Sequence, residues 1–463
     1  MRRTTPFPVG KAFRLPLAGI LLLAGPMAWA NTPLQVTTTT DSFDGLCDSH
    51  CSLRDAVQAA NLQAGADFIM LAPGDYVLSL PPAPDEQGVS RDEDDNRNGD
   101  LDVRDALTIR GYGERSRILG GGSDRLLEVM AGAALDLLRL SLEGGDTADN
   151  GGAVENHGDL LLHEVRVRNN RAVTAPGPLP ASEGYRHGQG GGIASYGQLD
   201  VHHSIFEGNH AEGVYWDDNL GRGGAIFNQG QLLMRDSEFR DNRVSDQGDR
   251  GAGGGLYNAG TANVARSLFV DNSGDEMGLG GAIANEGEGM LVLSNSTISS
   301  NTSGGLSNGY PSSTPPAVMP VMRLVHVSVV GNQGFGLMNW GEVLLRNSLI
   351  VANRDPVAGQ VVNCRNLGQS LYRAIGLLLE TDDGSCRADL YVDPALTGAQ
   401  LLHPLADNGG PTQTHALRSS GLALDASIGS CSGHDQRAVA RPLDGDGDGV
   451  AQCDLGAYEG HLP

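Results

Sequence analysis

Two acidic segments of the chain have the residue types and spacing of calcium-binding loops. Asp94, Asn96, Asn98, Asp102 and Asp105 fall on positions 1, 3, 5, 9 and 12 of the calcium-loop template, with Gly99 at position 6. Position 12 is Asp where Glu is usual, so the segment is not expected to be an EF-hand. In the second segment, Asp444, Asp446 and Asp448 alternate with glycines. Both segments predict calcium sites, and the alternative is that they are solvated acidic loops.

Aromatic and acidic residues gather in other variable segments of the chain. They are Tyr185, His187, Tyr215, Trp216, Asp217, Asp218, Asp246, Asp249, Asp275 and Glu276. Aromatic rings stack on the apolar faces of sugars and carboxylates accept hydrogen bonds from their hydroxyls, so these residues predict a glycan contact surface. The alternative is that they are solvated loops with a Trp packed against the scaffold. No spacing among them identifies a catalytic set.

The six cysteines and the paired histidines have simpler interpretations. The cysteines form three local pairs, Cys47/Cys51, Cys364/Cys386 and Cys431/Cys453. An even count favours disulfides in an exported chain, and none of the spacings matches a zinc motif. His202 and His203 are neighbours in a predicted strand, where successive side chains point to opposite faces. We therefore expect them to be structural residues of a coil.

A repeated unit positions all of these residues. Each unit opens with glycine and a polar residue and closes with an apolar stretch and Asn. The opening residues are Asn156, Ser195, Asn228, Asn258, Asn285, Asn308 and Asn339, and the closing ones are Asn170, Asn209, Asn242, Asn272, Asn301, Asn332 and Asn353. In five of the seven units the two lie 14 residues apart, whereas the distance to the next unit shrinks as 25, 19, 16, 13, 7 and 7. The segment from the opening to the closing residue, which we call the fixed arc, therefore has a nearly constant length. The segment from the closing residue to the next opening one, the variable arc, does not.

The fixed arc predicts an all-β fold, a parallel β-helix. The shortest unit has 21 residues, which suits one coil of a solenoid but not a helix pair or a propeller blade. Its residues alternate apolar and polar, as strands do. Stacked coils bring equivalent asparagines together, so that each side-chain amide can bond to the next. A low-complexity linker would not keep the spacing.

The variable arc predicts where a ligand would bind. All insertions leave the coils at the same corner, so the segments 171–190, 210–222, 243–253 and 273–280 are expected to stack along one flank. Insertions on one face often form the binding face of a solenoid.

The ends of the chain indicate export and a capped solenoid. Residues 1–30 have the basic start, the apolar centre and the Ala-Trp-Ala end of a signal peptide. Without them the chain carries 28 arginines and no lysine against 56 acidic residues, a net charge of −28, which argues against binding nucleic acid. A capping box at Ser52–Asp55 predicts a short amphipathic helix at about 52–63 that covers the first coil. No transmembrane segment is expected in the mature chain.

Three stretches resemble known families of exported bacterial proteins. Cys51-Ser-Leu-Arg-Asp-Ala56 resembles the CSLREA domain, with Asp55 in place of Glu. Gly223-Gly-Ala-Ile226 and Phe239-Arg-Asp-Asn242 resemble polymorphic outer-membrane protein repeats. Asn408-Gly-Gly-Pro-Thr-Gln-Thr-His-Ala-Leu417 and Cys453-Asp-Leu-Gly-Ala-Tyr-Glu459 resemble the choice-of-anchor Q domain. The resemblance implies a right-handed, pectin-lyase-like β-helix at the cell surface or in the medium, but no particular reaction.

Together these observations predict a chain of four parts. They are a signal peptide (1–30), an N-terminal cap with the first coils (31–150), β-helix repeats with lateral insertions (151–355), and C-terminal coils with a cap (356–463). We expect a secreted or envelope-associated adhesin or glycan-binding protein without catalysis, with calcium as the one expected cofactor. The alternative is a polysaccharide lyase or hydrolase, because such enzymes share this fold. Fold alone does not assign an activity.

Overall fold

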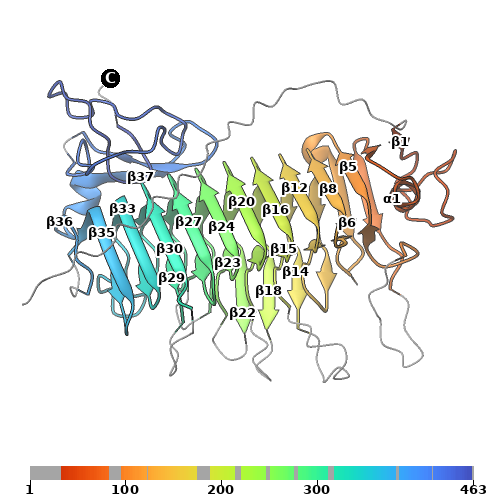
Figure 1. The fold of residues 1–463 in the computed structure, drawn as a ribbon, viewed down its shortest axis with the longest axis horizontal. Coiled ribbons are helices and arrows are strands. Elements are labelled where there is room, and N and C mark those ends of the chain that lie inside the picture. The colour runs from red at the N-terminus through yellow and green to blue at the C-terminus, as the bar shows by residue number, and fades with distance from the viewer. Residues whose placement is uncertain are drawn as a thin grey trace, which may run out of the picture.

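The chain forms a long right-handed parallel β-helix with a helix at one end and a C-terminal segment folded back along one side (Figure 1). The computed structural model describes residues 33–82, 95–122, 124–174, 188–213, 221–246, 251–275, 280–310, 318–381, 385–419 and 421–460. The predicted fold class is confirmed. The predicted signal peptide lies outside the described residues. Within the described ranges, no helix has the length and apolar character needed to cross a bilayer.

Each coil has up to four strands, which we assign to faces 1 to 4. In one central coil these are β19 (Ile226–Asn228), β20 (Gln231–Arg235), β21 (Glu238–Arg240) and β22 (Arg243–Asp246). Each strand pairs in parallel with its equivalent in the next coil, so Asn228 lies opposite Asn258. Asp236 and Asp241 take left-handed backbone conformations, with φ of 54°, at the two corners beside face 3. The fixed arc of the sequence is therefore faces 1 to 3.

The remaining strands follow the same plan. Face 1 also contains β4 (Leu101–Val103), β7 (Leu127–Val129), β11 (Val154–Asn156), β15 (Ile193–Ser195), β23 (Leu256–Asn258), β26 (Ile283–Asn285), β29 (Leu306–Asn308), β32 (Leu337–Asn339) and β34 (Cys364–Asn366). Face 2 also contains β1 (Leu34–Gln35), β2 (Asp67–Met70), β5 (Ala106–Arg110), β8 (Ala134–Leu138), β12 (Asp159–His163), β16 (Gln198–His202), β24 (Thr261–Ala265), β27 (Met290–Ser294) and β30 (Val321–Val325). Face 3 also contains β3 (Gly74–Leu78), β6 (Ser116–Gly120), β9 (Ser141–Glu143), β13 (Arg166–Arg168), β17 (Ile205–Glu207), β25 (Leu268–Val270), β28 (Thr297–Ser299), β31 (Ser328–Val330) and β36 (Leu390–Val392). The long strands β33 (Glu342–Val351) and β35 (Leu371–Glu380) continue from face 2 into face 3. Face 4 also contains β10 (Asp146–Thr147), β14 (Arg171–Val173) and β18 (His210–Gly213).

Two asparagine ladders run through the rod and confirm the predicted register. In the first, Asn228 Nδ2 donates to Asn258 Oδ1, and Asn258 Nδ2 to Asn285 Oδ1, each at 2.7 Å. In the second, Asn242 Nδ2 donates to Asn272 Oδ1 at 2.9 Å. The second ladder continues past the predicted units to Asn363. Between the ladders the core is apolar, and the rings of Phe206, Phe239 and Phe269 stack with centroids 4.6 Å apart.

The N-terminal end is closed by α1 (Leu53–Leu62) at the predicted position, with the Ser52–Asp55 capping box formed. Arg54 anchors this helix to the rod and is fully buried. Its guanidinium donates to the Asp41 carboxylate at 2.8 Å and to the backbone carbonyls of Gly99 and Asp100 at 2.8 and 2.9 Å. A short 3-10 turn (Gly113–Arg115) follows in the first coils.

Residues 402–460, which we call the C-terminal cap, fold back over face 3 of the last coils (Figure 1). A π-helical turn (Thr397–Leu401) leads into its antiparallel pair β37 (Leu402–Ala406) and β38 (Thr414–Leu417). The outward-facing residues of face 3 explain why the C-terminal cap covers only the last coils. On β21 they are the charged Glu238 and Arg240, whereas on β25 they are the buried, apolar Leu268 and Val270.

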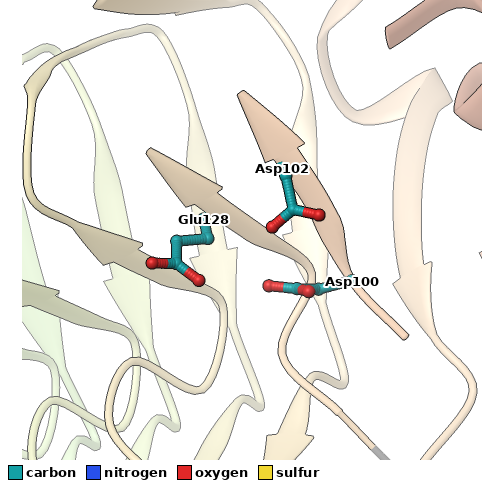
Figure 2. Close-up of side chains that lie close together, drawn as sticks. All are labelled: Asp100, Asp102 and Glu128. Atoms are coloured by element: carbon teal, nitrogen blue, oxygen red, sulfur yellow. The ribbon is translucent and has the colours of Figure 1, made fainter. Parts of the chain in front are cut away.

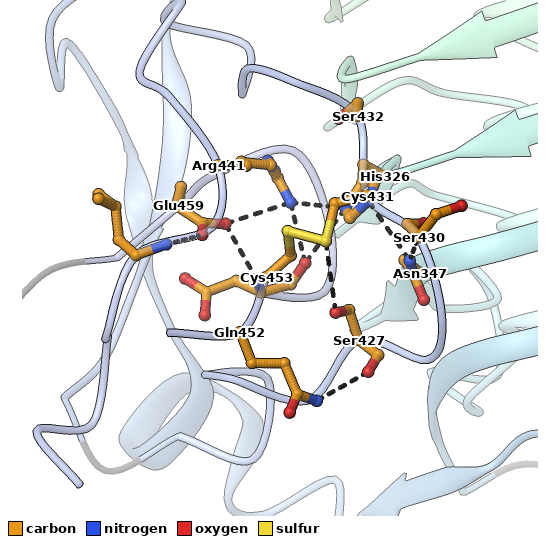
Figure 3. The surroundings of a disulfide bond; sticks show 12 residues. His326, Asn347, Ser427, Ser430, Cys431, Ser432, Arg441, Gln452, Cys453 and Glu459 are labelled. Atoms are coloured by element: carbon orange, nitrogen blue, oxygen red, sulfur yellow. Dashed lines mark hydrogen bonds and ion pairs between the residues drawn. A yellow bond between two sulfur atoms is a disulfide. The ribbon is translucent and has the colours of Figure 1, made fainter. Parts of the chain in front are cut away.

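One disulfide and a group of buried charges hold the C-terminal cap together. All three predicted disulfides form, Cys47–Cys51, Cys364–Cys386 and Cys431–Cys453. Figure 3 shows the last of these beside Arg441, which contacts Nδ1 of His326 on the rod and pairs with Glu459 of the cap at 3.3 Å. The Arg441 guanidinium also donates to the Asp454 carbonyl at 2.9 Å. The joint between cap and rod is therefore a buried polar network.

Candidate functional site

The outer side of face 1 has the most unusual side chains of the rod. On each of its strands the first and third residues point inward and the middle one points outward, as strand geometry requires. In-register pairing lines up the outward residues as Asp102, Glu128, Glu155, Ala194, Phe227, Tyr257, Ala284, Ser307, Met338 and Arg365. We call this the outer column. It is acidic at its N-terminal end and aromatic in the middle.

Aromatic rings extend along the outer column as one cluster, which we call the aromatic band: Tyr196, Phe227, Tyr257, Tyr310 and Trp340. Phe227 and Tyr257 stack with centroids 5.5 Å apart and an interplanar angle of 11°. Tyr196 lies 5.9 Å from Phe227. Phe227 and Tyr257 are buried, whereas Tyr196, Tyr310 and Trp340 are half-buried. The band therefore presents ring surface to solvent at its two ends.

Two charged side chains, Arg222 and Glu286, contact Tyr257 at the centre of the band. The Arg222 guanidinium carbon lies 5.1 Å from the centroid of the Tyr257 ring, within the range of a cation–π contact. The Tyr257 hydroxyl donates to Glu286 Oε2 at 3.1 Å. Burial raises the pKa of the Glu286 carboxyl, and burial together with Glu286 raises the pKa of Tyr257. The centre thus holds a buried acid whose pKa lies above its ordinary value.

Three buried carboxylates meet at the acidic end of the outer column (Figure 2). Asp100, Asp102 and Glu128 each place one oxygen within 4.8 Å of the others, and we call them the carboxylate cluster. Asp102 and Glu128 come from the neighbouring strands β4 and β7. Arg125, also buried, lies 3.7 Å from Asp100 and 3.3 Å from Glu128. The four groups together carry a formal charge of −2.

His157 connects the acidic end to the aromatic band. Its ring stacks on Tyr196 with centroids 4.9 Å apart and an interplanar angle of 9°. Its Nε2 lies 3.4 Å from Glu155 and 3.9 Å from Glu128. The hydrogen bond with Glu155 raises the pKa of His157. Acidic, imidazole and aromatic groups are therefore in continuous contact along face 1.

Most of the loop residues predicted to contact a glycan lie outside the described residues. These are Tyr185, His187, Tyr215, Trp216, Asp217, Asp218, Asp249 and Glu276. Asp246 is the last residue of β22. Asp275 Oδ2 accepts a hydrogen bond from the backbone N–H of Gly251 at 3.1 Å, so its carboxylate joins two neighbouring coils.

The predicted calcium residues have several different roles. Asp94 lies outside the described residues. The Asn96 side chain exchanges two hydrogen bonds with the Asp102 backbone, and the Asn98 carbonyl accepts one from Arg54. Asp105 accepts from the N–H groups of Gly65 and Ala106, which lowers the pKa of Asp105.

In the second calcium segment, Asp444 and Asp446 approach Asp425, and one oxygen from each lies within 4.8 Å of the others. Asp448 accepts from the Val450 N–H at 2.8 Å. Asp425 and Glu128 were not predicted, because each comes from a different coil or turn than the acidic segment itself. The outward position one residue before each ladder Asn could have identified Phe227 and Tyr257, whereas Tyr196 and Trp340 come one residue after the ladder residue of their coils.

Comparisons with known proteins bear on the repeat and on the fold. Residues 203–229 match the Chlamydia polymorphic membrane protein repeat. No match was found among curated proteins. Among solved structures, the crystal structure of pectate lyase Pel9A is similar with 12% sequence identity and a TM-score of 0.44, over 92% of this chain and 96% of that one.

Proposed function

We propose that this protein binds an extended glycan along the outer side of face 1 and acts as a secreted or cell-surface binding protein. The observation that carries the proposal is the outer column, where carboxylates pass directly into stacked aromatic rings. Rings hold the apolar faces of sugars and carboxylates accept bonds from their hydroxyls. A rigid solenoid keeps these groups in register, which lowers the entropic cost of binding a long ligand.

The predicted contact loops belong to the same proposal. Residues 214–225 join β18 on face 4 to β19 on face 1, and residues 247–255 join β22 to β23 in the same way. Trp216 and Asp217 lie outside the described residues, and we assign them to the same contact surface on the grounds of their residue types alone. The matched repeat, in a family named for membrane proteins, supports a cell-surface location.

Replacing an aromatic residue of the band is expected to weaken glycan binding about tenfold, which corresponds to loss of one well-placed contact. Trp340→Ala and Tyr196→Ala test the two ends, and Trp216→Ala tests the loop. The measurement is retention of the full chain on an array of immobilised bacterial and plant polysaccharides. Tyr391→Ala is the matched control, because Tyr391 is exposed on β36 and does not belong to the band. Equal retention of all variants and the parent would contradict the proposal.

Calcium is the second part of the proposal. Asp100, Asp102 and Glu128 offer hard oxygen donors of the kind calcium prefers, and Ca²⁺ would balance the −2 charge of the cluster and Arg125. Asp425, Asp444 and Asp446 offer a second donor set at the C-terminal cap. At the carboxylate cluster, bound calcium would connect the coils that contain β4 and β7.

Calcium is expected to raise the melting temperature of the chelator-treated protein, since a ligand present at about 100 times its Kd stabilises by about 2.7 kcal/mol. Glu128→Gln is expected to abolish the part of the shift due to the carboxylate cluster. Asp444→Asn is expected to leave that part intact and to remove only the contribution of the second donor set. Scanning calorimetry over a calcium titration separates the two. If Glu128→Gln responds to calcium like the parent, the cluster does not bind it.

Glycan cleavage is the second candidate function, and Glu286 favours it. A general acid must be protonated at the working pH, and burial raises the pKa of this carboxyl. Release of oligosaccharides from any retained polysaccharide, lost in Glu286→Gln, would identify the protein as a lyase or hydrolase. Retention without product would identify a binding protein.

A further inference from the structure

Three histidines meet at one corner of the rod, between faces 2 and 3 and away from the outer column. His163 ends β12 and lies in register with His202, the last residue of β16. His203 follows at the corner with a left-handed φ of 50°. Its ring centroid lies 5.6 Å from that of His163, with an interplanar angle of 86°, and the His163–His202 distance is 6.5 Å. The stacking of coils thus brings residues about 40 positions apart into contact.

Two carboxylates border this cluster. Glu164 Oε1 lies 3.6 Å from His163 Nε2, and Asp236 Oδ2 lies 3.9 Å from His203 Nε2. Arg266 holds Asp236 in a two-point ion pair at 2.7 and 2.6 Å. Glu164 pairs with Arg139 at 3.3 Å, but both side chains are 51% exposed, and such surface pairs contribute little. Glu164 is therefore the carboxylate that can exchange its partner at low cost.

His202 has a different role from the other two histidines. Its Nδ1 accepts a hydrogen bond from Arg235 Nε at 2.9 Å, which fixes the ring and places the remaining proton on Nε2. His202 Nδ1 is therefore already engaged by Arg235 and is not one of the nitrogens free to turn toward a metal ion.

We propose that His163, His203 and Glu164 form a binding site for a divalent transition-metal ion of the zinc type. Two imidazole nitrogens and one carboxylate oxygen are a usual donor set for zinc, with water in the fourth position. Two imidazoles bound to one tetrahedral zinc at about 2.1 Å have ring centroids about 5 Å apart, close to the separation of His163 and His203. The three donor atoms are not gathered within 4.8 Å of one another in the structure, so the two rings, whose side chains are 42% and 47% exposed, must turn toward a shared ion to bind it.

The site is independent of the proposed glycan and calcium sites. Its donors are nitrogen-rich and lie on a different corner, whereas the carboxylate cluster has oxygen donors alone. The order of affinity should follow the general one for such ligands, with Cu²⁺ above Zn²⁺ and with Mg²⁺ and Ca²⁺ far below. An excess of Ca²⁺ would therefore occupy the carboxylates and leave the histidine site open.

Titration calorimetry of the chelator-treated full chain with Zn²⁺ alone, in buffer containing excess Ca²⁺, tests the proposal. We expect one zinc per chain, with affinity reduced at least tenfold in His163→Gln and in His203→Gln. His202→Gln is the matched control and should bind zinc as the parent does. The same pattern should appear in the visible absorption of bound Co²⁺, and far-UV circular dichroism checks that each variant is folded.

Two results would overturn the assignment. One is zinc uptake by a His163→Gln/His203→Gln double variant equal to that of the parent. The other is a loss in His202→Gln as large as that in His203→Gln, which would place the metal on a different set of nitrogens.

Discussion

Asn242→Ala is expected to destabilise the middle of the rod by about 4 kcal/mol. Asn242 is fully buried, and its side chain joins three coils. Its Nδ2 donates to Asn272 Oδ1 at 2.9 Å and to the Phe206 carbonyl at 3.0 Å. Its Oδ1 accepts from the Asn209 side chain at 2.9 Å and from the Asn209 backbone N–H at 3.1 Å. Alanine leaves several buried polar groups without this partner, and each such group costs roughly 1–3 kcal/mol.

Urea unfolding together with hydrogen exchange of the central coils measures this effect. The matched control is Asn263→Ala, since Asn263 lies on β24 one coil away and its side chain faces solvent. The control should change the free energy of unfolding by less than about 0.5 kcal/mol. Because a solenoid is stabilised by contacts between neighbouring coils, the loss in Asn242→Ala should be greatest in the coils next to it. Equal stability of the two variants would mean that the ladder is not a main source of stability.

The ladders were predictable because the sequence repeats their surroundings in every coil. Asn228, Asn258 and Asn285 each follow two or three glycines and two or three apolar residues, and their spacing to the closing Asn is fixed or nearly so. A single coil would not have been convincing, but seven copies make the register unambiguous. The first helix was predictable for a local reason, since Ser52 and Asp55 satisfy each other's backbone groups whatever the rest of the chain does.

The carboxylate cluster was only half predictable. Asp100 and Asp102 lie within the acidic segment, but Glu128 lies 26 residues later, in coils whose lengths do not repeat. The calcium-loop template assumes that one loop supplies every ligand, whereas stacked coils bring donors together across strands. The same reasoning applies to His163 and His203, which meet through the register of β12 and β16. Chemistry in a solenoid is assembled between coils, so local motifs detect part of each site.

The position of the C-terminal cap could not be deduced from its own residues. Several of its polar contacts with the rod span more than 100 positions, as for Thr297 with Gln436 and Ser299 with His415. The residues of the rod indicate where the cap lies, because the outward positions on face 3 change from charged on β21 to apolar on β25. Apolar residues facing outward on both positions of one strand require a cover.

The stability of the C-terminal cap is expected to depend little on pH in the parent and strongly in two variants. Burial raises the pKa of Asp454 to about 7, from an ordinary value of 3.8. Burial, followed by the charge of Arg441, lowers the pKa of His326 to about 3, from 6.5. Glu459 and Arg441 face Asp454, and Arg441 and Arg346 face His326. Each shift corresponds to a free energy on the order of 4 kcal/mol.

The two groups act in opposite directions between about pH 4 and 6.5. In that window Asp454 keeps its proton in the folded cap but loses it in the unfolded chain, so its contribution to stability falls as pH rises. His326 is protonated in the unfolded chain but not in the folded cap, so its contribution rises with pH. Each slope is about 1.4 kcal/mol per pH unit, and the two cancel.

Removing either group should therefore leave the cap with the pH-dependent stability that the other group causes. In the His326→Gln variant the cap is expected to become more stable by nearly 3 kcal/mol when the pH falls from about 6.5 to about 4.5. In the parent the stability of the cap is expected to change little over the same range. In the Asp454→Asn variant the cap is expected to become less stable by a similar amount over the same fall in pH. Hydrogen exchange of residues 421–460, corrected for intrinsic exchange rates, measures both. Other titrating groups of the cap are shared by all three proteins, so their contributions drop out of the difference. Parallel curves for the parent and both variants would show that neither group is held in the protonation state that its burial favours, and that the joint between cap and rod is open to water.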